Sequence, residues 1–135
     1  MRGELLLDTG PLVALLNRRD RHHRWAVEAL AVRARVITCE SVLSEAFFLL
    51  SASSRASAGL RGMLSERALE VAKLSDELGP ITKLMGRYAN VPMSLADSCL
   101  VRLSELFPKG VVATIDSDFL VYRRFGRQVI PVLMP

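Results

Sequence analysis

The sequence predicts a three-layer α/β/α sandwich with a mainly parallel central sheet. The chain has 135 residues, of which 50% are hydrophobic, and this is enough to bury one substantial core. Short apolar runs alternate along it with segments whose apolar residues recur at helical spacing. Strands separated by helices pair in parallel and leave helices on both faces of the sheet. Because no repeat or long linker divides the chain, residues 1–135 are expected to form a single domain.

The first half of the chain predicts two strands and three helices. Its first apolar run is continuous and short, as in a buried parallel strand, and Pro11 suits the first turn of the helix that follows. Ser41 is placed to cap the third helix. The expected elements are strand 4–8, helix 12–16, helix 25–32, strand 36–38 and helix 42–50.

The second half predicts three strands and two helices. Residues 51–62 are rich in Ser, Ala and Gly and receive no assignment. Pro92 and Ser94 mark the start of one helix, and Pro131 restricts the last strand to a sheet edge. The expected elements are strand 68–72, helix 75–88, helix 94–106, strand 111–115 and strand 129–132.

The composition favours a basic protein without a membrane span. Eighteen Lys and Arg against fourteen Asp and Glu give a net charge of +4, which makes polyanions expected partners. No uncharged stretch approaches the roughly 18 apolar residues of a spanning helix, and Asp8 interrupts the N-terminal apolar run. We therefore expect a cytoplasmic protein. Cys39 and Cys99 have neither zinc-site nor disulfide-scaffold spacing and are expected to be buried free thiols.

Acidic residues from four parts of the chain are expected at one edge of the sheet. Asp8 ends the first strand, and Asp116 and Asp118 follow the strand at 111–115. Asp97 lies in the first turn of its helix, and Glu45 lies one turn into the helix after the second strand. In open α/β sheets, ligands bind outside the carboxyl ends of the strands, where the topology changes direction. Glu40, five residues before Glu45, is a reserve candidate, and the other acids, among them Glu77 and Glu105, are expected to be solvated surface charges.

Such a cluster of carboxylates predicts a site for a hard divalent cation. Two carboxylates about 4 Å apart repel by roughly 4 kcal/mol at an effective dielectric near 20, unless a cation or a proton intervenes. Oxygen ligands without nearby His or Cys favour Mg²⁺ or Mn²⁺. The chemistry that follows is metal-assisted hydrolysis of a phosphate ester. The hydroxyl groups of Thr9, Ser98 and Thr114 stand beside the acids in sequence and are candidates for positioning water or phosphate.

Arginine is concentrated shortly after the first helix. Arg18, Arg19, Arg21 and Arg24 are candidate contacts to an RNA backbone, because guanidinium groups bind phosphates in bidentate fashion. A solvated helix face is the alternative, since no aromatic stacking platform accompanies them. Further candidates near the acidic edge are Arg123, Arg124 and Arg127.

Four motifs together resemble the PIN-domain family of metal-dependent ribonucleases, and in particular its VapC-like toxins. The motifs are Leu-Leu-Leu-Asp8-Thr-Gly, Glu45 after Ser41-Val-Leu-Ser44, Leu95-Ala96-Asp97-Ser98, and Thr114-Ile-Asp116-Ser-Asp118-Phe119. By position, the resemblance implies a catalytic quartet of Asp8, Glu45, Asp97 and Asp116, with Asp8, Asp97, Asp116 and Asp118 as candidate metal ligands. Ser98 departs from the family pattern, because many relatives have Ala there.

The resemblance also implies an activity and partners. It implies a PIN-like fold, a Mg²⁺- or Mn²⁺-dependent endoribonuclease acting on structured RNA such as tRNA or rRNA, a homodimer, and a cognate antitoxin of a type II toxin–antitoxin system. Two other interpretations stay open: a non-catalytic RNA-binding or regulatory PIN-like domain, and a phosphatase with Asp8 as nucleophile. The second is disfavoured because residue 10 is Gly, where such an enzyme would place an acid/base Asp. Taken singly, each acid could also be an ordinary turn or helix-cap residue.

Overall fold

The computed structural model describes residues 3–33 and 35–135 and confirms the predicted α/β class. The helices and strands, in chain order, are β1 (Glu4–Leu7), α1 (Thr9–Leu16), α2 (His23–Ala31), β2 (Arg35–Cys39), α3 (Glu40–Leu49), α4 (Ser54–Ser65), β3 (Glu70–Ala72), the 3₁₀ helix η1 (Ser75–Glu77), α5 (Leu78–Arg87), α6 (Leu95–Leu106), β4 (Val111–Ala113), the 3₁₀ helix η2 (Ser117–Leu120), β5 (Arg123–Arg124), β6 (Gln128–Val129) and β7 (Val132–Leu133).

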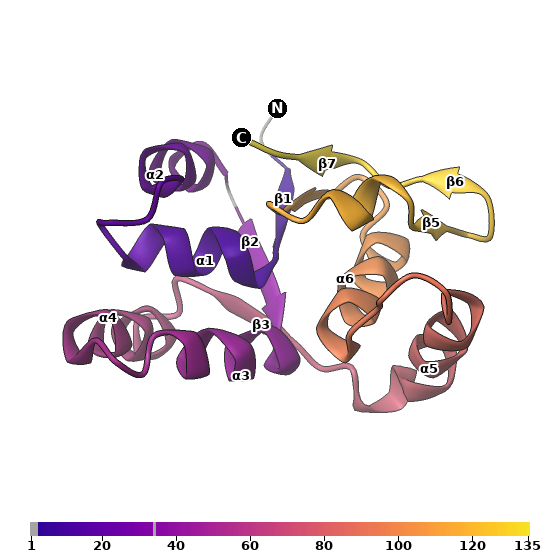
Figure 1. The fold of residues 1–135 in the computed structure, drawn as a ribbon, viewed down its shortest axis with the longest axis horizontal. Coiled ribbons are helices and arrows are strands. Elements are labelled where there is room, and N and C mark those ends of the chain that lie inside the picture. Colours follow the sequence, from indigo (N-terminus) through magenta and orange to yellow (C-terminus); the bar gives the residue numbers. More distant parts are fainter. Residues whose placement is uncertain (1–2, 34) are drawn as a thin grey trace.

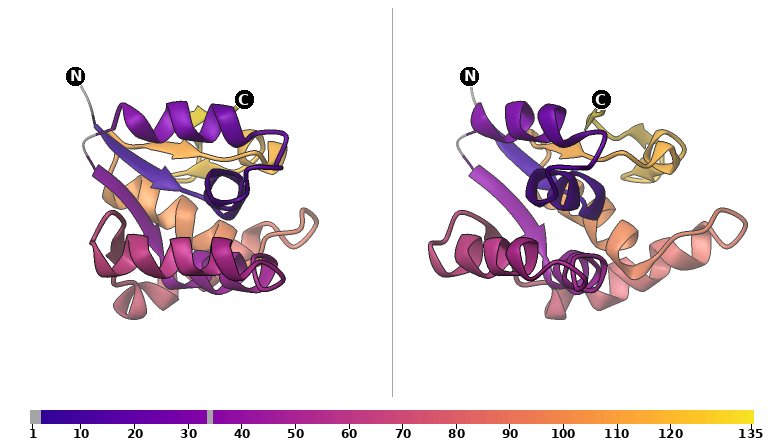
Figure 2. Two further views of the ribbon diagram at one scale, coloured as in Figure 1. Left: turned by 90° about the vertical axis from the view of Figure 1, so that its left-hand side faces the viewer. Right: turned by 60° about the vertical axis from the view of Figure 1, so that its left-hand side comes forward.

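A five-stranded parallel sheet lies between two layers of helices. Its strand order is β3-β2-β1-β4-β7, so the chain builds outward from β1 to β3 and then returns to the other side of β1. Figure 1 shows α1 to α4 on one side of the strands and α5 and α6 on the other. Figure 2, turned to face the first of these sides, shows α1, α2 and α4 in front of the strands and α6 behind them.

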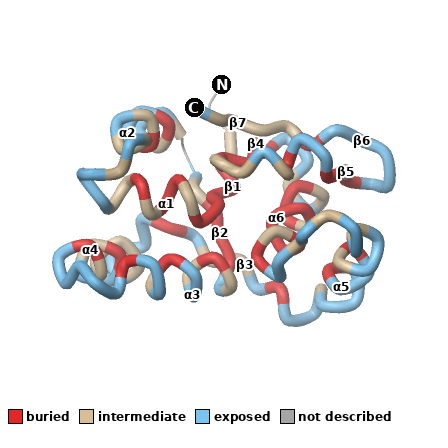
Figure 3. Tube along the Cα trace, viewed as in Figure 1, coloured by how far each residue is buried: buried red, intermediate tan, exposed pale blue. Residues whose placement is uncertain are grey.

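The core is centred on β1, because this is the middle strand of the five. Its residues Leu5, Leu6 and Leu7 are fully buried, as expected for a parallel strand covered on both faces. Leu6 pairs with Ile37 of β2 and Val112 of β4, both of which are also inaccessible. In Figure 3 the buried residues follow β1 and β2 and the inward side of α6. The continuous apolar run therefore marks the centre of the molecule.

Helices α3 and α4 differ from the sequence prediction. Cys39, not Ser41, is the N-cap of α3, and the Ser41 hydroxyl instead contacts the Cys99 sulfur at 3.3 Å. The unassigned Ser-, Ala- and Gly-rich segment forms most of α4. Ser53 caps this helix by accepting a hydrogen bond from the Ala56 backbone N–H at 3.1 Å. With Ala56 and Leu60 as its buried residues, the segment has too narrow an apolar stripe for a clear helical pattern.

The C-terminal strand prediction was wrong in its boundaries. Residues 128–129 form β6, which pairs antiparallel with β5, a strand that the sequence did not predict. Phe125 and Gly126 form the turn between them with positive φ angles of 51° and 83°. The parallel edge strand is β7, and Pro131 precedes it with its carbonyl accepting a hydrogen bond from the Val112 N–H. Strands of two residues are too short to show the alternation of apolar and polar side chains by which a strand is predicted.

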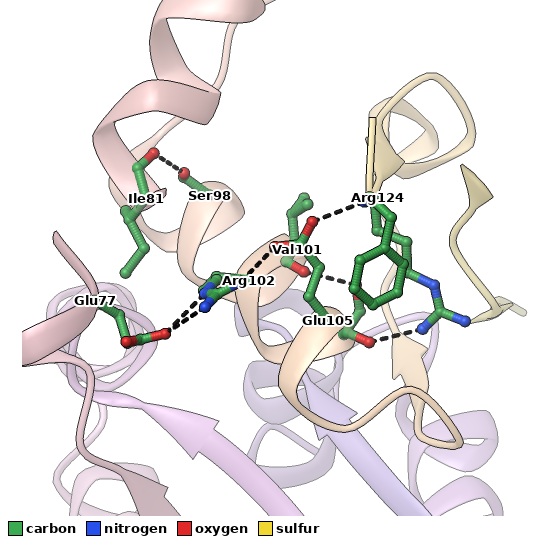
Figure 4. A network of polar contacts seen from close by, with 9 residues as sticks. Glu77, Ile81, Ser98, Val101, Arg102, Glu105 and Arg124 are labelled. Atoms are coloured by element: carbon green, nitrogen blue, oxygen red, sulfur yellow. Dashed lines mark hydrogen bonds and ion pairs between the residues drawn. The ribbon is translucent and has the colours of Figure 1, made fainter. Parts of the chain in front are cut away.

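Two acids expected to be solvated surface charges instead join helices. Arg102 of α6 forms ion pairs with Glu77 at 2.7 Å and with Glu105 at 2.9 Å, as Figure 4 shows. These carboxylate side chains are only 25% and 11% exposed. Glu105 also accepts a hydrogen bond from the Phe125 backbone N–H at 2.7 Å. The prediction for Glu77 and Glu105 was therefore wrong, because tertiary packing brings Arg102 between them.

Two other sequence predictions can be compared with the structure. Cys39 and Cys99 are both buried free thiols, as predicted. Among the described residues, no helix combines the length and the apolar character needed to cross a membrane.

Candidate active site

The four acids of the expected quartet line one pocket. Its volume is about 360 Å³, and it lies outside the carboxyl ends of β1 and β4, where the strand order changes direction. The topology therefore collects at one place carboxylates that are far apart in sequence. The residues that line this acidic pocket are Asp8, Thr9, Gly10, Glu45, Leu49, Asp97, Ile115 and Asp116.

Asp8 is held by hydrogen bonds to both of its carboxylate oxygens. It follows β1 directly, its N–H donates to the Ala113 carbonyl at 3.0 Å, and it is the N-cap of α1. One carboxylate oxygen, Oδ1, accepts from the Thr9 N–H at 2.8 Å, and the other, Oδ2, accepts from the Thr114 hydroxyl at 2.7 Å. With the residue only 7% exposed, both oxygens keep a fixed direction at the junction of β1 and β4.

Asp116 is oriented by the loop that follows β4. Its backbone N–H donates to the Thr114 hydroxyl oxygen at 3.0 Å, so this hydroxyl connects Asp116 to Asp8. The Asp116 Oδ1 atom accepts from the Asp118 N–H at 2.9 Å and caps the short helix η2. Thr114 therefore does not line the pocket, but its hydroxyl fixes the positions of Asp8 and Asp116 relative to each other.

Asp97 is fixed by a capping box at the start of α6. Its Oδ2 atom accepts from the Ser94 N–H at 3.1 Å, and its own N–H donates to the Ser94 hydroxyl at 3.0 Å. The Tyr122 hydroxyl lies 3.3 Å from the same Oδ2 atom. Asp97 therefore combines a structural role with a place on the pocket wall.

Burial, together with the neighbouring carboxylates, raises the pKa of Asp8, Asp97 and Glu45. Burial raises the pKa of Asp8 from 3.8 to about 6, with smaller contributions from the charges of Asp97 and Asp116, although the hydrogen bonds from Thr114 and Thr9 oppose the rise. Burial also raises the pKa of Asp97, aided by Asp116, and partial burial together with Asp97 raises that of Glu45. A pocket of mutually repelling carboxylates with raised pKa values is an environment that a cation would stabilise.

The chemistry of the pocket fits a hard divalent cation. Its polar groups are carboxylates and a hydroxyl, which are the ligands that Mg²⁺ and Mn²⁺ prefer. The Thr9 Oγ1 atom is buried and has no hydrogen-bond partner, so a polar group is left unsatisfied in this wall. In the described part of the chain, no three His, Cys, Asp or Glu side chains already form a cluster that could hold an ion. Mg²⁺ requires no such cluster, because it usually binds one or two carboxylates and keeps several waters.

A larger and more apolar cavity adjoins the acidic pocket. Its volume is about 610 Å³, and it is lined by residues of α3, α5 and α6 together with the ends of β2 and β3. Cys39, Ser41 and Cys99 lie in its wall, and Glu45 is common to both cavities. Glu45 therefore lies at the boundary between an acidic and an apolar environment.

Two other predicted site residues lie off the pocket wall. Ser98 is fully buried and its hydroxyl donates to the Ile81 carbonyl of α5, as Figure 4 shows, so it is a packing contact between helices. Asp118 lies in the first turn of η2, and its backbone N–H donates to the Asp116 carboxylate. The expectation of a substrate contact at Ser98 is not supported by this placement.

The predicted arginines separate into different surroundings. Arg18 and Arg19 line a second, separate pocket, which Arg21 and Arg24 do not. Arg24 forms an exposed ion pair with Glu28 at 3.4 Å. Of the alternatives, Arg124 is buried and donates to backbone carbonyls, and Arg123 donates to three carbonyls near its own position.

Sequence reasoning did not identify several residues of the acidic pocket. A Cβ atom on Gly10 would lie 3.2 Å from the Ile115 side chain, so Gly10 allows the start of α1 to approach the loop that carries Asp116. Leu49 is 58% exposed on α3 and forms an apolar part of the rim. Tyr122 does not line the pocket, but its hydroxyl contacts Asp97, and the residue carries no local sequence signal. Gly10, two residues after Asp8, and Ile115, directly before Asp116, could have been found from their positions.

Comparisons with known proteins agree with this architecture. A family model described as PIN domain matches residues 5–124. The solved structure of VapC20 from Mycobacterium tuberculosis, described as a toxin that cleaves the sarcin–ricin loop, superposes with a TM-score of 0.75 at 20% identity, over 84% of this chain and 91% of that one. A chain of VapBC2 from Rickettsia felis, solved bound to a DNA fragment of its promoter, has a TM-score of 0.65 at 14% identity, over 98% of this chain and 99% of that one. No curated protein matched the sequence.

Proposed function

The chain belongs to the PIN-domain family, and from this premise we propose that it is a metal-dependent endoribonuclease that hydrolyses RNA phosphodiester bonds in the acidic pocket. The observation that carries the proposal is the convergence of Asp8, Glu45, Asp97 and Asp116 on one pocket from four chain segments. Capping accounts for Asp8, Asp97 and Asp116 one by one, but it does not require their carboxylates to share one pocket with Glu45. Raised pKa values, as at Asp8, Asp97 and Glu45, are typical of functional sites.

The residues of the pocket divide into binding and proton-transfer roles. Asp8, Asp97 and Asp116 would hold Mg²⁺ or Mn²⁺, and Asp118 would contribute by orienting Asp116 or by holding a metal-bound water. When bound, the cation lowers the pKa of a water molecule, polarises the phosphate and stabilises charge on the leaving oxygen. Glu45 is exposed and its pKa is raised, so its carboxylate is suited to take a proton from the attacking water. The unpartnered Thr9 hydroxyl would orient water or a phosphate oxygen.

The test is cleavage of a pool of structured RNAs by the purified protein with Mg²⁺, with Mn²⁺ and with EDTA. Asp97→Asn is the principal variant, because an amide oxygen preserves the capping hydrogen bond from Ser94 while removing the charge. Asp76→Asn, on an exposed residue outside the pocket, is the matched control. We expect metal-dependent cutting by the wild type and the control and none by Asp97→Asn. Binding of RNA without cutting by well-folded protein in both metals would contradict the proposal and support a non-catalytic RNA-binding domain.

The proposed biological setting is that of a toxin in a type II toxin–antitoxin system. It rests on family membership and on the toxin and VapBC2 structures that share the fold. We propose a one-domain, cytoplasmic protein that forms a homodimer, cuts a structured RNA such as tRNA or rRNA, and is inhibited by a cognate antitoxin. Light scattering after size exclusion measures the dimer. Recovery of cell growth on co-expression with a small protein encoded alongside the chain tests the toxin and antitoxin roles.

A further inference from the structure

A second pocket combines three arginines from two separate chain segments. Its volume is about 410 Å³, and it lies between the end of α1 and the start of α4. The first segment contributes Arg18 and Arg19, and the second contributes Arg55. We call this the basic pocket. Its lining residues are Leu16, Asn17, Arg18, Arg19, Ala52, Ser53, Arg55 and Ala56.

The three guanidinium groups are not neutralised by the chain itself. Among the described residues, none of the three forms an ion pair with a carboxylate, whereas Arg24, Arg35 and Arg102 all do. The three exposed guanidinium groups place like charge around one hollow, which attracts an anion. The guanidinium fork matches the oxygen pairs of a phosphate group, which makes phosphate a suitable anion.

Backbone donors add to this attraction without defining the site. Helix α4 has 12 residues and begins at the wall of the basic pocket. The Ser53 hydroxyl oxygen satisfies the Ala56 N–H at 3.1 Å. Ser54 and Arg55 occupy the first turn, where N–H groups have no acceptor within the helix, and the positive end of the helix dipole lies there.

The basic pocket lies one helix length from the acidic pocket. Helix α1 contacts both, because Gly10 near its start lines the acidic pocket and Leu16 at its end lines the basic one. This separation is about 9 Å at 1.5 Å per residue, and a stacked nucleic-acid strand advances about 3.4 Å per nucleotide. The chain after α3 runs the same way, from Leu49 at the acidic rim to Ala52 at the basic pocket.

We propose that the basic pocket binds a phosphodiester group of the RNA strand that enters the acidic pocket, about three nucleotides from the bond that is cut. The inference rests on the proposed nuclease function, which it extends by assigning a place for the flanking strand. An acidic peptide offers similar oxygen atoms, but it has no phosphodiester bond that the acidic pocket could hydrolyse. An RNA strand is favoured because one ligand then accounts for both pockets.

The experiment measures RNA binding separately from RNA cleavage. All variants carry Asp97→Asn and are studied in EDTA, and the probe is a fluorescently labelled single-stranded RNA of mixed sequence followed by anisotropy. The test variant is Arg18→Gln, Arg19→Gln and Arg55→Gln together, with Arg55→Gln alone as a milder form. The matched control removes three exposed positive charges outside the basic pocket, as Arg61→Gln, Lys73→Gln and Lys109→Gln.

We expect the test variant to weaken RNA binding by about tenfold or more and the control by about twofold or less. The slope of log affinity against log salt should fall by about 0.7 for each phosphate contact that is lost. A single neutral methylphosphonate at the bound position should weaken binding to the parent protein and have no effect on the test variant.

Equal weakening in the test variant and the control would overturn the inference, because general charge would then explain the affinity. Binding of a polyglutamate peptide that depends on the three arginines, with RNA binding unchanged, would overturn it in favour of an acidic protein partner. If the wild type cuts RNA but the test variant binds RNA normally, the inference alone fails. If the wild type cuts no RNA but binds it through the three arginines, the nuclease proposal alone fails and the phosphate site stands.

Discussion

At the residue scale, Asp8 shows how the pocket opposes the stability of the fold. Its carboxylate is buried between β1 and β4, and its pKa of about 6 lies above the ordinary value of 3.8. An acid whose pKa is raised by folding stabilises the folded state below its unfolded pKa, and this contribution is lost as the pH rises through the folded pKa. The metal-free protein should therefore lose stability between about pH 4 and pH 6.

The variant Asp8→Asn isolates this contribution. One pKa unit corresponds to about 1.4 kcal/mol. Relative to the wild type, the variant should therefore gain unfolding free energy as the pH rises from about 4 to about 7, by up to about 3 kcal/mol at pH 7. The Thr9 N–H can still donate to an amide oxygen, so the local turn is preserved. Urea unfolding in EDTA at both pH values measures the difference. A difference that does not change with pH would show that the buried charge is not its cause.

The residue scale also shows where sequence reasoning failed within the site. Asp8 and Asp116 could be placed because each follows a strand, and parallel strands that run side by side end at one edge. Ser98 could not, because it lies on α6 and the direction of a helical side chain depends on which neighbour the helix packs against. Arg55 could not be placed either, because the segment around it shows no helical period and its helix was not predicted.

At the scale of single elements, α6 depends on one of the proposed metal-binding residues. Asp97 closes the capping box with Ser94, so its side chain contributes to the start of the helix and to the acidic pocket. Replacing a capping residue by Ala typically costs about 1 kcal/mol. Asp97→Ala should therefore reduce the unfolding free energy by about 1 kcal/mol more than Asp97→Asn, while both variants abolish cleavage.

Chemical denaturation of the two variants, alongside cleavage assays, measures this separation. Ser94→Ala is the complementary control: it removes the hydroxyl that accepts from the Asp97 N–H but leaves the pocket carboxylate in place. It should lose similar stability and keep cleavage activity. Equal stability of Asp97→Ala and Asp97→Asn would mean that the capping hydrogen bond contributes little to α6.

The elements also differ in how well the sequence predicted them. Strands β1 and β2 and helix α6 were predicted because they bury many apolar residues in a regular pattern. Helix α4 rests on a Ser cap and on Ala56 and Leu60, and the β5–β6 hairpin has two residues per strand. Helix α4 and this hairpin depend on contacts with residues distant in sequence, and the local pattern of apolar residues does not reveal those contacts.

At the scale of the whole molecule, the acidic pocket connects four segments, so a bound cation should stabilise the entire fold. Mg²⁺ or Mn²⁺ would reduce the repulsion among the carboxylates, and a ligand that binds only the folded state adds about 1.4 kcal/mol for each tenfold excess over its Kd. We expect either metal to raise the Tm of the wild type and of Asp76→Asn. The same metals should raise the Tm of Asp8→Asn and Asp97→Asn much less.

Thermal unfolding monitored by circular dichroism, in EDTA and across a series of metal concentrations, provides the measurement. Magnesium and sodium salts are compared at equal ionic strength, because screening alone also weakens repulsion between charges. Equal shifts in all four proteins would contradict a cation site in the acidic pocket.

The hydrogen bond from Thr114 to Asp8 joins residues 106 positions apart in the chain. During synthesis Asp8 leaves the ribosome long before β4, Thr114 and Asp116 are made. A nascent or prematurely terminated chain that stops before Val111 has β1 without one of its two neighbouring strands and cannot assemble the acidic pocket. The order of translation therefore delays the proposed nuclease until β4 and the loop that carries Asp116 have been made.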